Sequence, residues 1–217
     1  YFNLASDISA NEKIQVLAKS YLADTYFGRR TNQLDLETAS KAYEDLITQY
    51  PNHDLNTEWR KKKASALRQQ NQDDEAIVTL GKILDENQTE WEIAQLEIGN
   101  ILMSTSPQRF TVATNHYKAV IDKIQTKERK DEALLNYGIC LLKTNQGIDA
   151  IRVFQNLIQG SKNEQIITYS FQFLASCLKK KKNMKESIKL LEESLKKYPQ
   201  QKNQLFLHKE CVRLYHL

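Results

Sequence analysis

The chain has 217 residues, of which 41% are hydrophobic and 27% are charged, and it contains only six Gly and three Pro. This composition supplies a core but few turn signals, so it favours helices. No uncharged apolar run approaches the ~18 residues of a membrane span, and the first residues look like neither a start codon nor a signal peptide, so we expect a piece cut from a longer protein.

The apolar periodicity predicts helices along almost the whole chain, arranged in pairs. The predicted ranges are 11–27 and 36–49, 55–70 and 73–86, 89–104 and 109–124, 128–143 and 147–159, 164–180 and 184–197, and a closing helix at 202–216. The first pair carries a few extra loop residues between positions 27 and 36. Residues 1–10 are expected to be the remnant of an upstream repeat.

The second helix of each pair starts with the same pattern, and consecutive copies lie 37 residues apart. A small residue is followed by a bulky apolar residue four positions later and, in four of the five copies, by another apolar residue after three more. The copies are Ala39, Tyr43 and Leu46; Ala76, Leu80 and Ile83; Ala113, Tyr117 and Val120; Ala150, Phe154 and Leu157; and Ser187, Leu191 and Ser194. This spacing makes one stripe on a helix, with the small residue where a neighbouring helix approaches closely.

The first helix of each pair has its own signature. In the fourth pair it reads Leu134, Tyr137, Gly138 and Leu141, and in the fifth Phe171, Leu174, Ala175 and Leu178, at the same four offsets. A glycine inside a helix costs about 1 kcal/mol of propensity, so Gly138 indicates close packing against the paired helix.

These two signatures together resemble the tetratricopeptide repeat, whose pattern is W-x2-L-G-x2-Y, then A-x3-F and a proline. The match is strong in the last two repeats and weak in the first, and Tyr50-Pro51 and Tyr198-Pro199 end repeats as in bacterial members of the family. The resemblance implies an all-α, right-handed superhelical solenoid of about five helix pairs with a C-terminal capping helix. The expected repeats are residues 11–51, 55–88, 89–126, 128–161 and 164–199, with the cap at 202–217.

No group of residues predicts catalysis, a cofactor or a metal site. The four histidines lie in different repeats without metal-ligand spacing, and no glycine-rich phosphate loop is present. Cys140, Cys177 and Cys211 each stand alone in an apolar helical stretch, so we expect buried, inert thiols. Their odd number favours an intracellular, reducing compartment, while a periplasmic or envelope location stays open.

Charge is distributed unevenly along the chain. Residues 1–110 hold 12 Lys and Arg against 17 Asp and Glu, whereas residues 111–217 hold 19 against 10. Solvated helix faces explain this pattern most simply, and an acidic partner for the second half is the alternative. The basic runs at 60–63 and 179–182 lack interleaved aromatics, so nucleic-acid binding is not expected.

The resemblance implies a peptide-binding groove along the first helices of the pairs. Carried over to this chain, the groove residues are Ile93, Leu96, Asn100 and Met103, then Leu135, Asn136, Ile139 and Leu142, then Tyr169 and Gln172 with Ser176 and Lys179, and in the second repeat Lys61, Ser65 and Arg68. Its middle should be apolar and exposed, and its ends basic or polar. If the helices are rotated by one position, these residues belong to the core instead.

The family's best-known ligand is the C-terminal carboxylate of a heat-shock chaperone, held by paired Lys, Asn and Arg. Asn100 and Asn136 stand at such places, but Leu96, Tyr169 and Phe173 replace the cations, so carboxylate recognition is not expected. The resemblance therefore implies a protein-binding scaffold or chaperone-like adaptor for an apolar peptide or helix, without a small-molecule substrate or a membrane span. The alternative is a structural assembly module or spacer that associates with itself.

Overall fold

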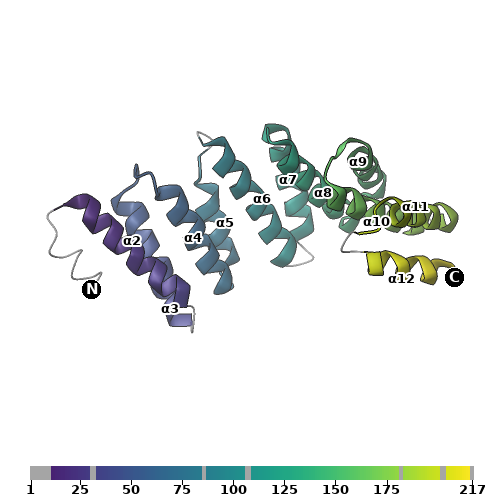
Figure 1. Cartoon of the computed structure of the whole chain (residues 1–217). Helices are drawn as coiled ribbons and strands as arrows, with labels where there is room; N and C mark the ends of the chain where they lie inside the picture. The colour runs from purple at the N-terminus through teal and green to yellow at the C-terminus, as the bar shows by residue number, and fades with distance from the viewer. Residues whose placement is uncertain are drawn as a thin grey trace. The chain divides into compact units, whose positions relative to one another are not determined.

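The computed structural model describes residues 11–29, 33–84, 87–105, 109–180, 183–200 and 204–215. Within these residues the chain forms eleven α-helices, one short 3-10 helix and no strand (Figure 1). The helices are α2 (Glu12–Arg29), α3 (Gln33–Gln49), α4 (Asn56–Gln69), α5 (Asp73–Gly81), α6 (Gln88–Thr105), α7 (Phe110–Val120), η2 (Ile121–Lys123), α8 (Lys127–Lys143), α9 (Gly147–Gly160), α10 (Glu164–Lys180), α11 (Met184–Lys197) and α12 (Gln204–Tyr215). None of the described helices combines the length and apolar character that crossing a membrane requires.

The chain divides into two compact units, Tyr1–Ile101 and Leu102–Leu217, here called the N-terminal and C-terminal units. In the N-terminal unit α2 packs on α3, α3 on α4, and α4 on α5. In the C-terminal unit α7 packs on α8, α8 on α9, α9 on α10, α10 on α11, and α11 on α12, while α8 also contacts α10. Consecutive helices therefore pair as the repeat predicts, and the predicted third pair, α6 and α7, falls on both sides of the division.

The 37-residue series forms the core of the repeats. All fifteen residues of the series are buried, including both serines of the last copy. The three residues of a copy lie on one face of the second helix, as their spacing requires, except that Ile83 follows the end of its helix. The prediction of an all-α fold built from repeated helix pairs is confirmed for the described residues.

Gly138 lies where α8 crosses α9. A Cβ atom added at Gly138 would stand 2.7 and 2.9 Å from two ring carbons of Phe154 and 3.2 Å from a methyl of Val153. Phe154 is itself fully buried, so its ring has little room to move aside. The sequence prediction that this glycine marks a close helix contact is confirmed.

Several predicted helix ends are wrong by a few residues. The helix α3 begins at Gln33 rather than 36, and Gly28 and Arg29, predicted as loop, end α2. The helix α5 ends at Gly81 instead of 86, because the backbone continues in turns that bond Lys82 to Thr79 and Ile83 to Leu80. At the end of α7 the chain tightens into η2, so the α-helix stops at Val120. The predicted remnant at 1–10 and part of the loop at 30–32 lie outside the described residues.

Candidate functional site

One face of α10 lines two neighbouring hollows in the C-terminal unit. Tyr169, Gln172, Ser176 and Lys179 follow the i, i+3, i+7, i+10 spacing of a single helix stripe. Tyr169 contributes to a hollow between α8 and α10, and the other three contribute to a hollow between α10 and α12. The stripe predicted for the fifth repeat therefore lies on a concave surface that runs along first helices.

The hollow between α8 and α10 has a volume of about 410 Å³. Leu135, Ile166 and Tyr169 supply its apolar part, and Asn136 is also in its wall. The remaining lining residues are polar or charged and come from the starts of the two helices: Glu128, Arg129, Glu132, Asn163 and Gln165. This combination suits a ligand that has an apolar side chain and a polar backbone.

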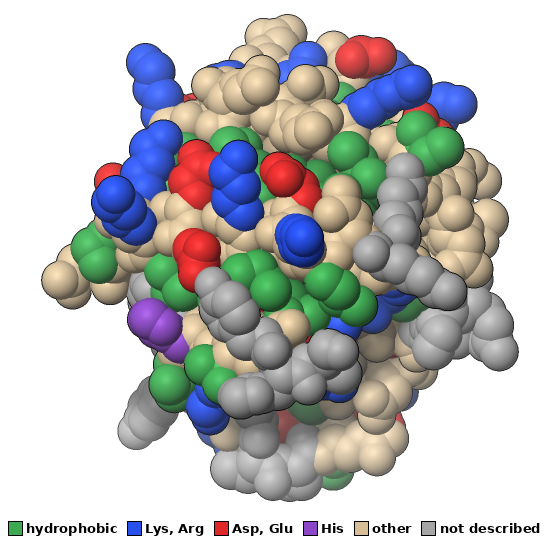
Figure 2. Space-filling view, turned by 90° about the vertical axis from the view of Figure 1, so that its right-hand side faces the viewer, with side chains coloured by type: hydrophobic (Ala, Val, Ile, Leu, Met, Phe, Trp, Pro, Cys, Tyr) green, Lys and Arg blue, Asp and Glu red, His purple; other side chains and the backbone are tan. Residues whose placement is uncertain are grey.

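The hollow between α10 and α12 has a volume of about 340 Å³. Lys179 of α10 donates to Glu210 of α12 at 2.7 Å, and Arg213 lies 3.7 Å from the same carboxylate. Phe173 and Phe206 provide apolar walls beside these charges. Two cations share one carboxylate, so the local charge is positive. Figure 2, which shows the C-terminal end, has Lys and Arg side chains together with several Asp and Glu side chains among the hydrophobic ones.

The prediction that the middle of the groove is exposed is wrong for three residues. Leu96, Leu135 and Leu142 retain only 6–8% of their surface. In the C-terminal unit the cause is visible, because Leu135 and Leu142 belong to the same core cluster as Ile166 of the neighbouring first helix. Ile139 packs half-buried against that cluster, and Ile93 and Met103 are also half-buried. These first helices pack against one another through part of the face that was predicted to bind.

The two asparagines are half-buried. The Nδ2 of Asn136 donates to the hydroxyl of Tyr117 at 3.1 Å, so its amide nitrogen is already engaged inside the unit. Asn100 also has interactions of its own. The lining residues of α12, Phe206, Glu210 and Arg213, were missed from the sequence, because α12 was interpreted as a cap rather than as another first helix.

In the N-terminal unit, ion pairs occupy the corresponding face of the first helices α4 and α6. Lys61 of α4 bonds Glu58 at 2.9 Å and Glu90 of α6 at 3.0 Å, and Arg68 pairs with Glu97 in the same way. Partial burial alone would lower the pKa of Lys61, but the hydrogen bonds to the two glutamates outweigh it and the pKa is raised. A small hollow of about 210 Å³ lies there, lined by Lys61, Ser65 and Ile93 among others.

The basic run at 60–63 is internally paired. Arg60 donates to Asn56 at 2.8 Å, Lys62 bonds Asp24 at 2.8 Å, and Lys63 pairs with Glu44. Each of the four cations thus has a partner within the N-terminal unit. In the second run Lys179 is paired and Lys180 is exposed, while 181–182 lie outside the described residues.

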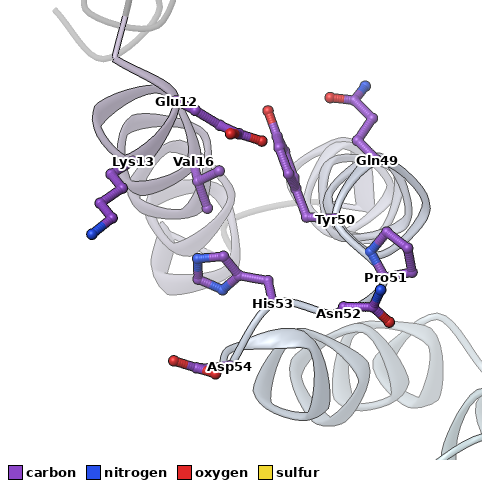
Figure 3. A pocket seen from close by; sticks show the side chains of 9 residues that line it. All are labelled: Glu12, Lys13, Val16, Gln49, Tyr50, Pro51, Asn52, His53 and Asp54. Carbon is purple, nitrogen blue, oxygen red and sulfur yellow. The ribbon is translucent and has the colours of Figure 1, made fainter.

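A further hollow of about 490 Å³ lies at the start of the N-terminal unit (Figure 3). It is bounded by the beginning of α2 and by the loop between α3 and α4, and it contains none of the predicted groove residues. Its lining residues are Glu12, Lys13, Val16, Gln49, Tyr50, Pro51, Asn52, His53 and Asp54. The His53 ring stacks on Trp59 at 5.0 Å between centroids, and its Nδ1 accepts from the backbone of Leu55, so His53 has a structural role.

The three cysteines are buried and free, as predicted. Burial raises the pKa of the Cys140 thiol to about 12, so the reactive thiolate is scarce at neutral pH. Across the part of the chain that the structure describes, no three His, Cys, Asp or Glu side chains are grouped as a metal would require.

The sequence and the structure were compared with known protein families. The sequence profile of the tetratricopeptide repeat matches residues 17–53 and 174–200, and similar solved structures belong to the same family. Two segments of the chain therefore match the tetratricopeptide repeat, and the described helices share the fold of that family. The first match covers the repeat in which the motif is weakest, and the second covers the end of α10 and all of α11. The search of curated proteins found no match to the chain.

Solved structures support the same fold at low sequence identity. The domain is similar to YrrB, described as a tetratricopeptide protein with an unusual peptide-binding site, at 13% identity and a TM-score of 0.62, covering 96% of this chain and 97% of that one. It is also similar to TTC0263, a thermophilic tetratricopeptide protein of Thermus thermophilus, at 11% identity and a TM-score of 0.53, covering 93% and 100%. A MamA RS-1 structure matches at 15% identity and a TM-score of 0.59, covering 82% and 93%.

Proposed function

We propose that this tetratricopeptide domain is a protein-interaction scaffold that binds an extended segment of a partner along α8, α10 and α12. The observation that carries the proposal is the α10 stripe, since one continuous face borders both hollows. A segment lying along this face would place one side chain in the hollow with Tyr169 and another in the hollow with Lys179. Fold and family support protein binding in general, and the structurally similar YrrB is described as having a peptide-binding site.

The partner segment is expected to be both apolar and acidic. Apolar side chains fit beside Leu135 and Ile166 in the first hollow and beside Phe206 in the second. The excess of cations among residues 111–217, together with the shared carboxylate of Glu210, favours negative charge in the ligand. Leu135 and Ile166 are themselves mostly buried, so they form the floor of the first hollow.

This proposal changes the predicted groove in one respect. The N-terminal end of the predicted groove contains Lys61 and Arg68, whose charges are satisfied by Glu90 and Glu97. A ligand there would have to break existing ion pairs, whereas the C-terminal unit offers open hollows. Binding is therefore proposed for the C-terminal unit, as a binding role without catalysis.

The test is a selection of random peptides displayed on phage, followed by fluorescence anisotropy with one selected peptide. We expect enrichment of peptides that combine an aromatic or aliphatic residue with Asp or Glu. Tyr169→Ala should weaken binding by at least about tenfold, as expected for a central aromatic contact. Tyr50→Ala is the matched control, because Tyr50 is a half-buried tyrosine that lines the hollow of Figure 3 in the other unit. Loss of binding in Tyr50→Ala with retention in Tyr169→Ala would overturn the proposal.

A further inference from the structure

The hollow between α8 and α10 has more carboxylates than cations. Its charged lining residues are Glu128, Glu132 and Arg129, all near the start of α8. The lining residues on the α10 side, such as Asn163 and Gln165, are uncharged, so one negative charge is left in excess. Both glutamates are exposed, and within the described part of the chain neither of them forms an ion pair. The hollow therefore has an apolar floor and an acidic rim.

The hollow between α10 and α12 has the opposite excess. Lys179 and Arg213 line it with a single carboxylate, that of Glu210, which both cations contact. The Arg213 side chain is 69% exposed, and its guanidinium has five N–H donors, so it can bind a ligand without leaving Glu210. The sign of the local charge thus changes along α10, although residues 111–217 as a whole are basic.

The α10 stripe sets the distance between the two hollows. Tyr169 at one hollow and Lys179 at the other are separated by about 15 Å along the helix axis, at 1.5 Å per residue. An extended segment rises about 3.3 Å per residue, so it spans this distance in about four or five residues. The Debye length in physiological salt is about 8 Å. Each hollow therefore acts on a bound segment mainly through its own charges.

We infer that the partner segment carries a basic residue in the hollow between α8 and α10 and an acidic residue, about four or five positions away, in the hollow between α10 and α12. This inference rests on the proposed function and adds a position for each charge of the segment. A Lys or Arg side chain fits the first hollow, because its methylene stem packs on Tyr169 and Leu135 while its charged end meets Glu132. A carboxylate at the same place would be repelled by the two glutamates.

The first experiment compares two phage libraries with the full chain as bait. Both contain a fixed Asp among random residues, and the residue about four positions away, on either side, is Lys in one library and Asp in the other. We expect the best Lys–Asp peptide to bind at least about fivefold more tightly than the best Asp–Asp peptide in fluorescence anisotropy, because a repulsion replaces an ion pair.

The outcomes separate this inference from the proposed function. Tighter binding of Asp–Asp peptides would mean a uniformly acidic partner, which overturns the inference and leaves the proposed function standing. Enrichment from a fully random library but from neither fixed library would do the same. If no library yields a binding peptide, both the inference and the proposed function are wrong.

A variant of α8 tests whether the base of the peptide meets Glu132. Glu132→Gln should weaken a Lys–Asp peptide about threefold, the size of an exposed ion pair, and should not weaken the same peptide after its Lys is replaced by Ser. Glu132 is preferred to Glu128, because Glu128 lies in the first turn of α8 and also stabilises the helix dipole. The matched control is Glu193→Gln, which changes an exposed glutamate of α11 outside both hollows and should alter neither affinity.

A variant of α12 tests the acidic end of the peptide in the same way. Arg213→Gln should weaken the Lys–Asp peptide about threefold and should not weaken the version in which Ser replaces Asp. Lys189→Gln is its control, since Lys189 is an exposed cation of α11 that lines neither hollow. Tyr169→Ala should weaken every version of the peptide, whatever its charges. Glu132→Gln or Arg213→Gln acting equally on the charged and the Ser-substituted peptides, or on neither, overturns the inference.

Discussion

Each of the two units has a surface made of first helices, and the chemistry of these two surfaces differs. In the N-terminal unit neighbouring first helices are linked by polar side chains. Lys62 of α4 and the hydroxyl of Tyr43 both donate to Asp24 of α2, at 2.8 and 2.6 Å, while Lys61 reaches Glu90 of α6. In the C-terminal unit α8 and α10 meet through buried apolar residues such as Leu135 and Ile166. The comparison shows that the buried 37-residue series determines the repeat fold. The outer face of the first helices can instead either carry ion pairs or leave hollows that accept a ligand.

This difference has energetic consequences. Ion pairs that are about one-third exposed contribute roughly 0–1 kcal/mol, because solvent screens them and ordering the side chains costs entropy. An apolar side chain buried in a core contributes about 1.5–3 kcal/mol. The C-terminal wall should therefore tolerate charge poorly at its buried positions, while the N-terminal wall should tolerate the loss of single charges.

The largest expected effect is that of Leu135→Asp. The substitution places a carboxylate in the core cluster of the C-terminal unit, and we expect a loss of at least about 3 kcal/mol in the free energy of unfolding. Denaturant unfolding followed by circular dichroism measures this loss. Lys61→Gln, at the equivalent place in the N-terminal wall, should cost less than about 1 kcal/mol. Equal losses in the free energy of unfolding for the two substitutions would contradict the proposed difference between the two units.

A smaller effect is expected from Gly138→Ala. The new methyl group would gain about 1 kcal/mol of helix propensity but would overlap the Phe154 ring, so we expect a net loss of roughly 1–2 kcal/mol. Gly147→Ala is the control, because a Cβ there meets nothing within 4 Å and should leave stability unchanged or slightly higher. Thermal melts of both variants decide the matter, and a melting temperature raised by Gly138→Ala would mean that α8 and α9 do not cross there.

The smallest expected effect concerns pH. The hydrogen bond from Lys63 holds the pKa of Glu44 below its usual value, so this pair stabilises the N-terminal unit above the unfolded pKa of about 4.3 and stops doing so as pH falls through the lower folded value. Because Glu44 is half exposed, we expect about 0.5 kcal/mol or less. The two tryptophans, Trp59 and Trp91, both lie in the N-terminal unit, so their fluorescence follows its unfolding. Lys63→Gln should reduce the loss of stability between neutral and acid pH, and an unchanged acid response would show that this pair contributes nothing.

The sequence predicted the fold better than the site, for identifiable reasons. The 37-residue series predicted the core residues because the spacing i, i+4, i+7 puts the small residue and the large ones on one face of a helix. The same spacing put Tyr169 and Lys179 on one helix stripe, and in the structure the two residues line neighbouring hollows; their role in binding stays a prediction. Leu135 and Leu142 were predicted to be exposed because α8 is apolar on two faces. Periodicity alone does not distinguish a face that packs on the next first helix from a face that is open to a ligand.

The ion pairs of the N-terminal wall were also missed, although a signal was present. Lys61 with Glu90 and Arg68 with Glu97 are both separated by 29 residues, so the two pairs repeat one offset between successive first helices. In a helical repeat, opposite charges that recur at the same long sequence separation indicate ion pairs between neighbouring first helices. The α12 residues Phe206 and Arg213 could have been found by treating α12 as a further first helix.

The central claim is that the ligand lies on the wall of the C-terminal unit. Hydrogen exchange of the protein with and without a phage-selected peptide, read by mass spectrometry, tests it most directly because it reports on both units in one measurement. The account predicts slower exchange in α8, α10 and α12 and unchanged exchange in α2 and α4. Protection confined to α2, α4 or the loop that carries Tyr50 would contradict it.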